Sequence, residues 1–553
     1  MPRRFSSLMF ISILLCAGLL AAAPAQPARA DTYTVTNSSS SGAGSLRQAI
    51  LDANNHAGQD IIGFAIPTSD PGYSSALGVW FLRLSFVLPM LEDPAGVVID
   101  GSTQPGSSPD LPGIIIEHTT AVPVGVSLLK IISQDNTIKY LGFFNGRGDG
   151  VIIDGDQNVL MHNQIFASAG YGVHLLAGAE ENSIDGNKIC GHALDGIRLQ
   201  SAHHNVINNN SVGEQPLYLP SVGRNLGNGI SLIQSDSNTI SGNLISNNTL
   251  DGLLLSESDE NQILQNTIGL NLSRTSELGN GGYGILLEQS AGNLVDETWI
   301  SGNDKDGIRL TGANAAGNIL QRNSIGASYS GPIPNAQHGI GLYNGAHDNT
   351  IGSGSDGDLN NLILYNGWSG VAVVDSALGS NVIGNNFIYN QEFYGIHINN
   401  SVSNALVANT IAGNGGIGDC AGVRIENSSG TEGAADINLI WDNSIRNNHG
   451  KGIQLVGGAN NGIAAPVITS ASCKNVLGIA CPGCWVQVFS DDYDEGRVLE
   501  GVAVANSFGV FSLSSSFTGP HLTAVAVDGP GNSSEFSLPA LGCFRHWLPI
   551  LMK

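Results

Sequence analysis

Acidic, basic and tyrosine side chains recur at fixed places beside glycine in the middle of this sequence. Asp195 and Arg198 stand three residues apart around a glycine, and Asp306 with Arg309 repeats the same pattern. Carboxylates are the oxygen ligands that Ca²⁺ prefers. The planar guanidinium of arginine binds anionic groups through paired hydrogen bonds. Acids, arginines and tyrosines on one face of a protein would therefore suit the binding of a polysaccharide.

The candidate ligand-binding residues are Asp195, Arg198, Asp251, Tyr283, Asp306 and Arg309. Three of them, Asp195, Asp251 and Asp306, are also candidates for holding Ca²⁺ against an anionic sugar. A second interpretation stays open, in which aspartate before glycine is turn chemistry, because Asp tolerates unusual backbone angles.

These residues belong to a repeat that runs from Asn136 to Leu455. An Asn-x-apolar step falls at Asn136, Asn158, Asn182 and Asn205, an interval of 22 to 24 residues. A period of this length predicts a solenoid. Each unit also carries a Gly-apolar-x-apolar step, and its apolar residues alternate over a few positions as in short strands. About three such strands fit into one unit.

The predicted fold is therefore all-β, a parallel β-helix that is right-handed by the crossover rule for parallel strands. Equivalent residues of neighbouring coils would lie ~4.8 Å apart. Asn163, Asn187, Asn210 and Asn243, each five residues after a repeat asparagine, are expected to form a ladder inside one turn. Side-chain amides can hydrogen-bond along such a stack.

Four longer segments interrupt the repeat, after Val212-Gly213, Ile268-Gly269, Ile325-Gly326 and Ile351-Gly352. Because they follow the same step, we expect them to leave from one corner and to form a wall beside the exposed Gly-apolar-x-apolar strands. The candidate groove would lie between these strands and the inserts near Tyr218, Arg274 and Tyr329. Small outward residues such as Ser231 and Gly341 are expected to leave room beneath the loops.

The ends of the chain differ from the repeat. Residues 1–30 are predicted to be a secretory signal peptide, because two arginines precede an apolar run and Ala-Arg-Ala precedes residue 31. Residues 31–130 should form an N-terminal cap with a helix over 45–55 and irregular first coils, and 131–463 the repeats. Residues 464–541 alternate as in an immunoglobulin-like β-sandwich, and 542–553 are an apolar tail. Because no later segment is long and apolar enough, we expect no membrane span.

Six cysteines follow the predicted cleavage site. At least one disulfide is expected among Cys473, Cys481, Cys484 and Cys543, whose connectivity the sequence leaves open. Cys190 and Cys420 fall on distant coils and should not pair. Cys481-Pro-Gly-Cys484 imitates a redox or zinc motif, but a strand rather than a helix follows it, which favours a structural bridge.

The net charge of the chain argues against polyanionic partners. The formal net charge is −24, which argues against nucleic acid, because a phosphate backbone requires a basic surface. A polyanionic polysaccharide would need a bridging cation, and Ca²⁺ is the natural candidate.

Several segments resemble the right-handed parallel β-helix repeat proteins secreted by bacteria, an architecture that pectate lyases share. They are Gly-Ser-Leu-Arg-Gln-Ala-Ile at 44–50, Asp-Ala-Asn at 52–54, residues 99–106, and Asn-Thr-Ile-Gly at Asn266 and Asn349. The resemblance implies the fold and favours a carbohydrate ligand. It carries no catalytic residue, because the sequence lacks the Gly-His-Gly of polygalacturonases and the Asp-Pro-His of alginate epimerases.

Two functions fit this pattern. One is a secreted or cell-surface protein that binds extracellular polysaccharide or cell-envelope glycan without catalysis. The alternative is a polysaccharide lyase or glycosidase that acts in the groove beside the inserts.

Overall fold

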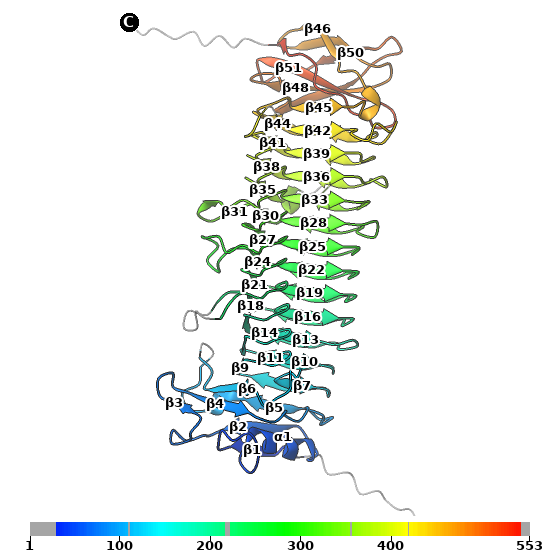
Figure 1. Ribbon diagram of the computed structural model, residues 1–553. Coiled ribbons are helices and arrows are strands. Elements are labelled where there is room, and N and C mark those ends of the chain that lie inside the picture. Colours follow the sequence, from blue (N-terminus) through cyan, green and yellow to red (C-terminus); the bar gives the residue numbers. More distant parts are fainter. Residues whose placement is uncertain (1–28, 109–110, 216–221, 354–356, 419, 543–553) are drawn as a thin grey trace, which may run out of the picture.

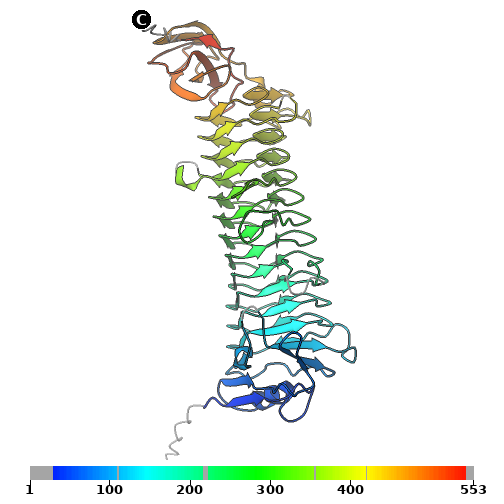
Figure 2. The ribbon, with the colours of Figure 1, turned by 90° about the vertical axis from the view of Figure 1, so that its left-hand side faces the viewer.

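Stacked parallel strands form a long straight column in the computed structural model (Figures 1 and 2). The structure describes residues 29–108, 111–215, 222–353, 357–418 and 420–542. Most of the predicted signal peptide, Tyr218 and the tail from Cys543 onward lie outside the described residues. The described chain is almost entirely strand and turn, which confirms the predicted all-β solenoid.

Three long sheets, which we call A, B and C, run the length of the column. Sheet A contains β1 (Thr32–Val35), β2 (Asp60–Phe64), β5 (Val97–Asp100), β8 (Thr137–Lys139), β11 (Val159–Met161), β14 (Ser183–Asp185), β17 (Val206–Asn208), β20 (Thr239–Ser241), β23 (Gln262–Leu264), β26 (Leu294–Asp296), β29 (Ile319–Gln321), β34 (Thr350–Gly352), β37 (Val382–Gly384), β40 (Ala405–Val407) and β43 (Leu439–Trp441). Sheet B contains β3 (Tyr73–Ser74), β4 (Val79–Leu84), β6 (Ile114–His118), β9 (Leu141–Phe144), β12 (Gln164–Phe166), β15 (Lys188–Cys190), β18 (Ser211–Val212), β21 (Leu244–Ile245), β24 (Thr267–Ile268), β27 (Trp299–Ile300), β30 (Ser324–Ile325), β35 (Leu362–Leu364), β38 (Phe387–Tyr389), β41 (Thr410–Ala412) and β44 (Ser444–Arg446). Sheet C contains β7 (Leu129–Ile131), β10 (Val151–Ile153), β13 (Val173–Leu175), β16 (Ile197–Gln200), β19 (Ile230–Ile233), β22 (Leu253–Ser256), β25 (Ile285–Glu288), β28 (Ile308–Thr311), β33 (Ile340–Tyr343), β36 (Val371–Val374), β39 (Ile396–Asn399), β42 (Val423–Glu426) and β45 (Ile453–Val456).

From β5 onward, each coil contributes one strand to each sheet, in the order A, B, C. One coil, for example, uses Ile184 in β14, Ile189 in β15 and Ile197 in β16, and all three side chains are completely buried. Their counterparts in the neighbouring coils are in register with them and form continuous apolar stacks. Because every coil buries its apolar residues against the coils on either side, the column lengthens without needing a wider core.

The predicted asparagine ladder is confirmed at the corner between sheets A and B. The backbone N–H of Asn163 donates to Oδ1 of Asn187, that of Asn187 to Asn210, and that of Asn210 to Asn243, each at 2.9 Å. These asparagines are all buried. The ladder continues toward Asn443, with Thr298 replacing asparagine in one coil.

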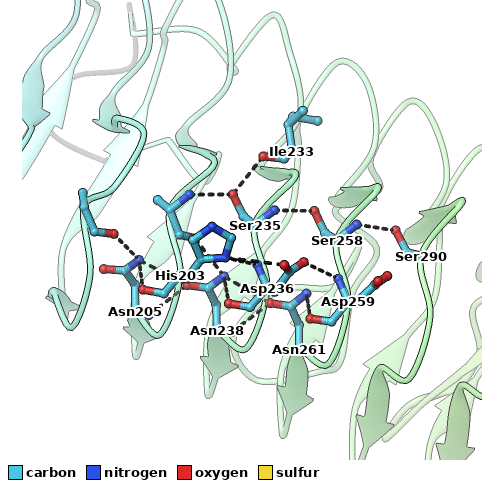
Figure 3. A network of polar contacts seen from close by, with 12 residues as sticks. His203, Asn205, Ile233, Ser235, Asp236, Asn238, Ser258, Asp259, Asn261 and Ser290 are labelled. Atoms are coloured by element: carbon cyan, nitrogen blue, oxygen red, sulfur yellow. Dashed lines mark hydrogen bonds and ion pairs between the residues drawn. The ribbon is translucent and has the colours of Figure 1, made fainter.

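Two further ladders were not predicted. The repeat asparagines themselves hydrogen-bond from coil to coil between Asn136 and Asn460, and Figure 3 shows Asn205, Asn238 and Asn261 in this row beside a parallel row of serines. The third ladder follows the corner between sheets B and C, from Asn225 to Asn448. All three corners of the column are therefore fastened by side-chain amides or hydroxyls.

A helix covers the N-terminal end of the column, as predicted. Helix α1 (Leu46–Asn54) begins after Ser45, whose hydroxyl accepts the backbone N–H of Gln48. Its buried face consists of Leu46, Ala49, Ile50 and Ala53, which join the same core as the strands. The helix therefore shields the apolar interior of the first coils from water. Short 3-10 turns occur at η1 (Gly101–Thr103), η2 (Gly357–Leu359) and η3 (Asn460–Gly462).

The other end of the column is covered by a small module of two antiparallel sheets. One sheet contains β46 (Val467–Ala471), β47 (Asn475–Ile479) and β50 (Val510–Ser514), and the other β48 (Trp485–Asp491), β49 (Val498–Val504), β51 (His521–Val527) and β52 (Ala540–Leu541). Glu495 of this module accepts the backbone N–H and the side-chain amide of Asn448. Gln487 similarly accepts the backbone N–H of Asp442. The module thus takes the place of a next coil.

One of the predicted disulfides is present in the module. It joins Cys481 and Cys484, which agrees with the structural interpretation of this motif. Cys473 is also disulfide-bonded, whereas Cys190 and Cys420 carry thiols. Within the described part of the chain, no helix is long and apolar enough to span a membrane.

Candidate functional site

The predicted binding residues lie on sheet C and on the turns that lead into its strands. Asp195 and Arg198 belong to the coil of β16, and Asp306 and Arg309 to that of β28. Strands β19, β22 and β25 lie between them. At a strand spacing of ~4.8 Å, the two pairs are about 19 Å apart. A single sugar unit cannot contact both pairs.

Asp195 is committed to hydrogen bonds with the next coil. Its Oδ1 accepts the backbone N–H of Asn228 at 2.7 Å, and its Oδ2 accepts the hydroxyl of Ser231 at 2.7 Å. The Arg198 guanidinium lies 3.6 Å from the same carboxylate. Asp195 is only 6% exposed. The carboxylate therefore fastens two coils together, which is the structural role that the sequence left open.

Asp306 and Asp251 are used in the same way. Asp306 accepts the backbone N–H of His338 at 2.9 Å and Nε of Arg309 at 2.6 Å. Asp251 accepts the backbone N–H of Tyr283 at 2.7 Å. Burial raises the pKa of both carboxyl groups above the usual value for aspartate. Asp306 is completely buried, so its carboxylate is not exposed to a ligand on this surface.

The three aspartates do not form the predicted Ca²⁺ site. Asp195, Asp251 and Asp306 precede β16, β22 and β28, so each is two coils from the next. This separation is about 9.6 Å, whereas Ca²⁺ holds its oxygen ligands at about 2.4 Å. Among the residues that the structure describes, no three acidic, histidine or cysteine side chains are placed to hold a metal ion.

The inserts that carry Arg274 and Tyr329 lie against sheet B, so these two described inserts do not form the predicted groove with sheet C. Arg274 donates to the hydroxyl of Thr267 in β24 and lies over the ring of Trp299 in β27. Tyr329 packs against the same Trp299 ring, and its backbone N–H donates to the Arg274 carbonyl. The hairpin of β31 (Ala327–Ser328) and β32 (Gly331–Pro332) accordingly extends on the side of sheet B (Figure 1).

The inserts also do not share one corner. Those after Gly213, Gly269 and Gly326 connect sheet B to sheet C, but the one after Gly352 connects β34 of sheet A to β35 of sheet B. The same Ile-Gly step therefore occurs at two different corners.

The small outward residues do not leave the expected space. Ser231 is completely buried beneath its contact with Asp195. A Cβ atom at Gly341 would lie 2.7 Å from Oδ2 of Asp306 and 2.7 Å from the ring of Tyr343. The room above Gly341 is thus filled by the side chains around it.

An open aromatic pocket occurs further along sheet C, and sequence reasoning missed it. It crosses the coils of β33, β36 and β39. Its described lining residues are His338, Tyr343, Trp368, Ser369, Val374, Phe393, Tyr394 and His397. Trp368 is 42% exposed, so much of its ring is available to a ligand.

Contacts between these side chains fix the shape of the pocket. His338 packs edge-on against Trp368 with ring centroids 5.0 Å apart, and Tyr394 packs against His397 at the same distance. Nδ1 of His338 accepts the backbone N–H of Ser369 at 3.1 Å. Burial lowers the pKa of His338 to about 3 and also lowers that of His397. Burial raises the pKa of Tyr343 to about 12.

Two arginines border this pocket, one at each end. The guanidinium carbon of Arg309 lies 3.7 Å from the centroid of the Tyr343 ring and 5.0 Å from that of Tyr283. Arg424, next to His397 in the register of sheet C, donates from Nε to Glu426 at 2.9 Å. The predicted residues Tyr283, Asp306 and Arg309 therefore adjoin the pocket, whereas Asp195 and Arg198 lie several coils away.

A second pocket, on sheet B, has fewer polar groups. It is enclosed by apolar side chains such as Val79, Phe81, Phe143 and Phe166. Among its described lining residues, Gln164 alone has a polar side chain. Such a surface has too few polar groups to orient a sugar.

Comparisons with known proteins concern the fold. The Dettilon tailspike protein is 13% identical, with 91% of each chain covered and a TM-score of 0.41. The A-module of mannuronan C-5 epimerase AlgE4 from Azotobacter vinelandii is 16% identical, with 69% of this chain and 96% of that chain covered and a TM-score of 0.38. The periplasmic alginate epimerase AlgG is 12% identical, with coverage of 66% and 80% and a TM-score of 0.39.

A search of curated proteins found no match to this sequence. Residues 124–218 and 221–357 match the family model described as "Right handed beta helix region". The chain therefore contains a right-handed β-helix region, and the same coil pattern continues to β45.

Proposed function

We propose that this protein binds extracellular polysaccharide on the outer face of sheet C, at the aromatic pocket of β33, β36 and β39. The protein is exported by its N-terminal signal sequence and acts outside the cell or at its surface. Its C-terminal module, an immunoglobulin-like sandwich over residues 464–541, holds the column away from its attachment point.

The pocket is the observation that supports this proposal. Ligand sites combine aromatic walls with a few polar groups that fix orientation, and here tryptophan, phenylalanine and tyrosine rings alternate with histidine and serine. Rings of this kind contact the apolar faces of sugars, and the tyrosine and histidine polar atoms can bond hydroxyl groups. The pocket crosses three coils, about 10 Å from the first strand to the last, which suits a short stretch of a polysaccharide.

Tyr283 and Arg309 extend the proposed site toward the N-terminal end of sheet C. The Arg309 guanidinium lies over both the Tyr283 ring and the Tyr343 ring. A longer glycan would continue over Asp251 and toward Asp195 and Arg198 along the same face. In this proposal the aspartates shape the surface and the aromatic side chains supply most of the contact.

Replacing Trp368 by alanine tests the site. A screen of soluble and insoluble polysaccharides would first identify a ligand, and calorimetry would then compare the variants. Trp368→Ala should weaken binding at least tenfold, because an exposed ring in the pocket is lost. Trp485→Ala is the matched control, since Trp485 is 51% exposed but lies in the C-terminal module. Equal affinity of both variants would show that the pocket is not the binding site.

His397 favours a catalytic alternative at the same place. Its Nε2 lies 3.6 Å from the Glu426 carboxylate, and burial lowers the pKa of the imidazole, which favours its neutral form. A neutral histidine can remove a proton from a substrate, as a polysaccharide lyase requires. Release of unsaturated sugar ends by the wild type, abolished in His397→Ala, would support this function. Bound polysaccharide that stays intact would support binding alone.

A further inference from the structure

We infer that the polysaccharide bound at the aromatic pocket is built from uncharged sugars. This inference rests on the proposed function and specifies its ligand. It differs from the expectation of an anionic sugar bridged by Ca²⁺, and it follows from the distribution of charge around the pocket.

The described wall of the pocket carries no carboxylate, ammonium or guanidinium group. None of the eight described residues that line it is Asp, Glu, Lys or Arg. Its two histidines are the only described lining groups that could become cationic near neutral pH. An anionic sugar seated there would therefore need the histidines to be protonated.

Geometry keeps His338 neutral. Nδ1 of His338 accepts a hydrogen bond from the backbone N–H of Ser369, and a protonated nitrogen could not accept it. The ring is also packed against Trp368 and lies near Arg309, whose charge opposes a second positive charge. His397 is half-buried beside Tyr394 and next to Arg424 in the sheet. The nearby Glu426 carboxylate favours a cationic His397, but burial outweighs it and lowers the pKa.

Each arginine that borders the pocket is already neutralised by a carboxylate. Nε of Arg309 donates to Asp306 at 2.6 Å, and its guanidinium lies against the Tyr343 ring. Arg424 donates from Nε to Glu426 at 2.9 Å and from a terminal nitrogen to Gln454 at 2.9 Å. An anionic sugar would have to displace one of these carboxylates or lie beside it. Either arrangement leaves a negative charge near the pocket without a partner, which is unfavourable.

The charge of the whole chain acts in the same direction. At a formal net charge of −24, long-range repulsion disfavours the approach of a polyanion. Neutral sugars avoid both the unpaired negative charge and the long-range repulsion. Their hydroxyl groups donate and accept hydrogen bonds, and their carbon faces contact aromatic rings. The described wall of the pocket carries partners of both kinds, the hydroxyl-bearing tyrosines Tyr343 and Tyr394 and the rings of Trp368 and Phe393.

The experiment compares oligosaccharides of matched length from a neutral panel of glucans, mannans and galactans and an anionic panel of polygalacturonate, alginate and chondroitin sulfate. Calorimetry on the full mature chain is done at low and at high salt. We expect a neutral ligand to bind with an affinity that salt changes less than about twofold, since no ion pair is formed. Anionic ligands should bind at least tenfold more weakly. A salt-sensitive anionic ligand that binds more tightly than every neutral one would overturn the inference.

The Trp368→Ala variant distinguishes failure of the proposed function from failure of the inference about charge. If Trp368→Ala binds its ligand as tightly as Trp485→Ala, the pocket is not the site, and this inference falls with it. If Trp368→Ala abolishes the binding of an anionic ligand, the site is correct and only the inference about charge is wrong.

A second variant tests the charge argument directly. Glu426→Gln keeps the size of the side chain but leaves Arg424 without its carboxylate. It should gain affinity for an anionic oligosaccharide by about tenfold, and this gain should disappear at high salt. Glu288→Gln is the matched control, because Glu288 occupies the equivalent register position on β25, outside the pocket. Equal behaviour of the two variants would show that the Arg424–Glu426 pair does not exclude anions.

Discussion

Replacement of Asn210 by alanine would break the central asparagine ladder at one coil. Oδ1 of Asn210 accepts the backbone N–H of Asn187 at 2.9 Å and its side-chain amide at 3.0 Å. Nδ2 of Asn210 donates to the Ile184 carbonyl at 2.8 Å and to Oδ1 of Asn243 at 3.0 Å. The site is 1% exposed, so water cannot replace these partners without entering the core.

The size of the effect follows from the groups that lose partners. The backbone N–H of Asn187 is left without its acceptor, and the Ile184 carbonyl loses a donor. The amide of Asn187 keeps its bond to the Leu160 carbonyl. An unsatisfied buried polar group costs about 1–3 kcal/mol, so two such groups lower the free energy of unfolding by about 2–6 kcal/mol.

Urea unfolding and amide hydrogen exchange would measure this loss. The control is Asn314→Ala, because Asn314 is exposed and stands outside the ladders. We expect a lower unfolding midpoint for Asn210→Ala and faster exchange of the Asn187 amide. If both variants unfold within about 0.5 kcal/mol of each other, which is the usual range for surface substitutions, the ladder does not stabilise the column.

Two other predictions concern the module and the pocket. Burial raises the pKa of Glu495 to about 7, so the folded protein holds a proton that the unfolded chain releases above pH ~4.5. The free energy of unfolding should therefore fall by about 3 kcal/mol as pH rises through this window. Glu495→Gln should flatten that fall, because Gln391 already fills a ladder position with the same contacts, and equal pH slopes of both proteins in thermal unfolding would contradict this. Gly341→Ala should lower stability by about 1–3 kcal/mol and weaken glycan binding, because its Cβ meets Tyr343 at 2.7 Å. Gly529→Ala, where a Cβ meets open space, is its control, and the same melting temperature for both would refute the crowding argument.

The regular part of this fold could be predicted because each coil repeats the same local rule. A spacing of 22 to 24 residues fixes which residues become neighbours, and Asn163 therefore meets Asn187 in the structure. The helix at Leu46–Asn54 was equally predictable, since its apolar residues recur with helical spacing and Ser45 precedes it.

The pocket was harder to predict, because its residues occupy positions that are not equivalent in the repeat. Tyr343 ends a strand, whereas Trp368 stands two residues and Tyr394 one residue before a glycine in later coils. Only the register of the strands brings these side chains together. Asp195 and Asp306 were predicted to bind a ligand because they are acidic. In the structure, a carboxylate before glycine instead accepts the backbone N–H of the next coil. The side on which an insert packs depends on tertiary contacts such as Arg274 with Trp299, which no local pattern shows.

The asparagine ladders give the column a direction. In each ladder the backbone N–H points toward the C-terminal neighbour, whose Oδ1 accepts it. Removing coils from the C-terminal end would therefore expose N–H donors, whereas removing them from the N-terminal end would expose amide oxygens. Buried donors without partners are tolerated less often than acceptors. At the end of the ladder between sheets B and C, Glu495 accepts the backbone N–H of Asn448. During synthesis, the ladder N–H of each coil therefore has no acceptor until the next coil or this module has formed.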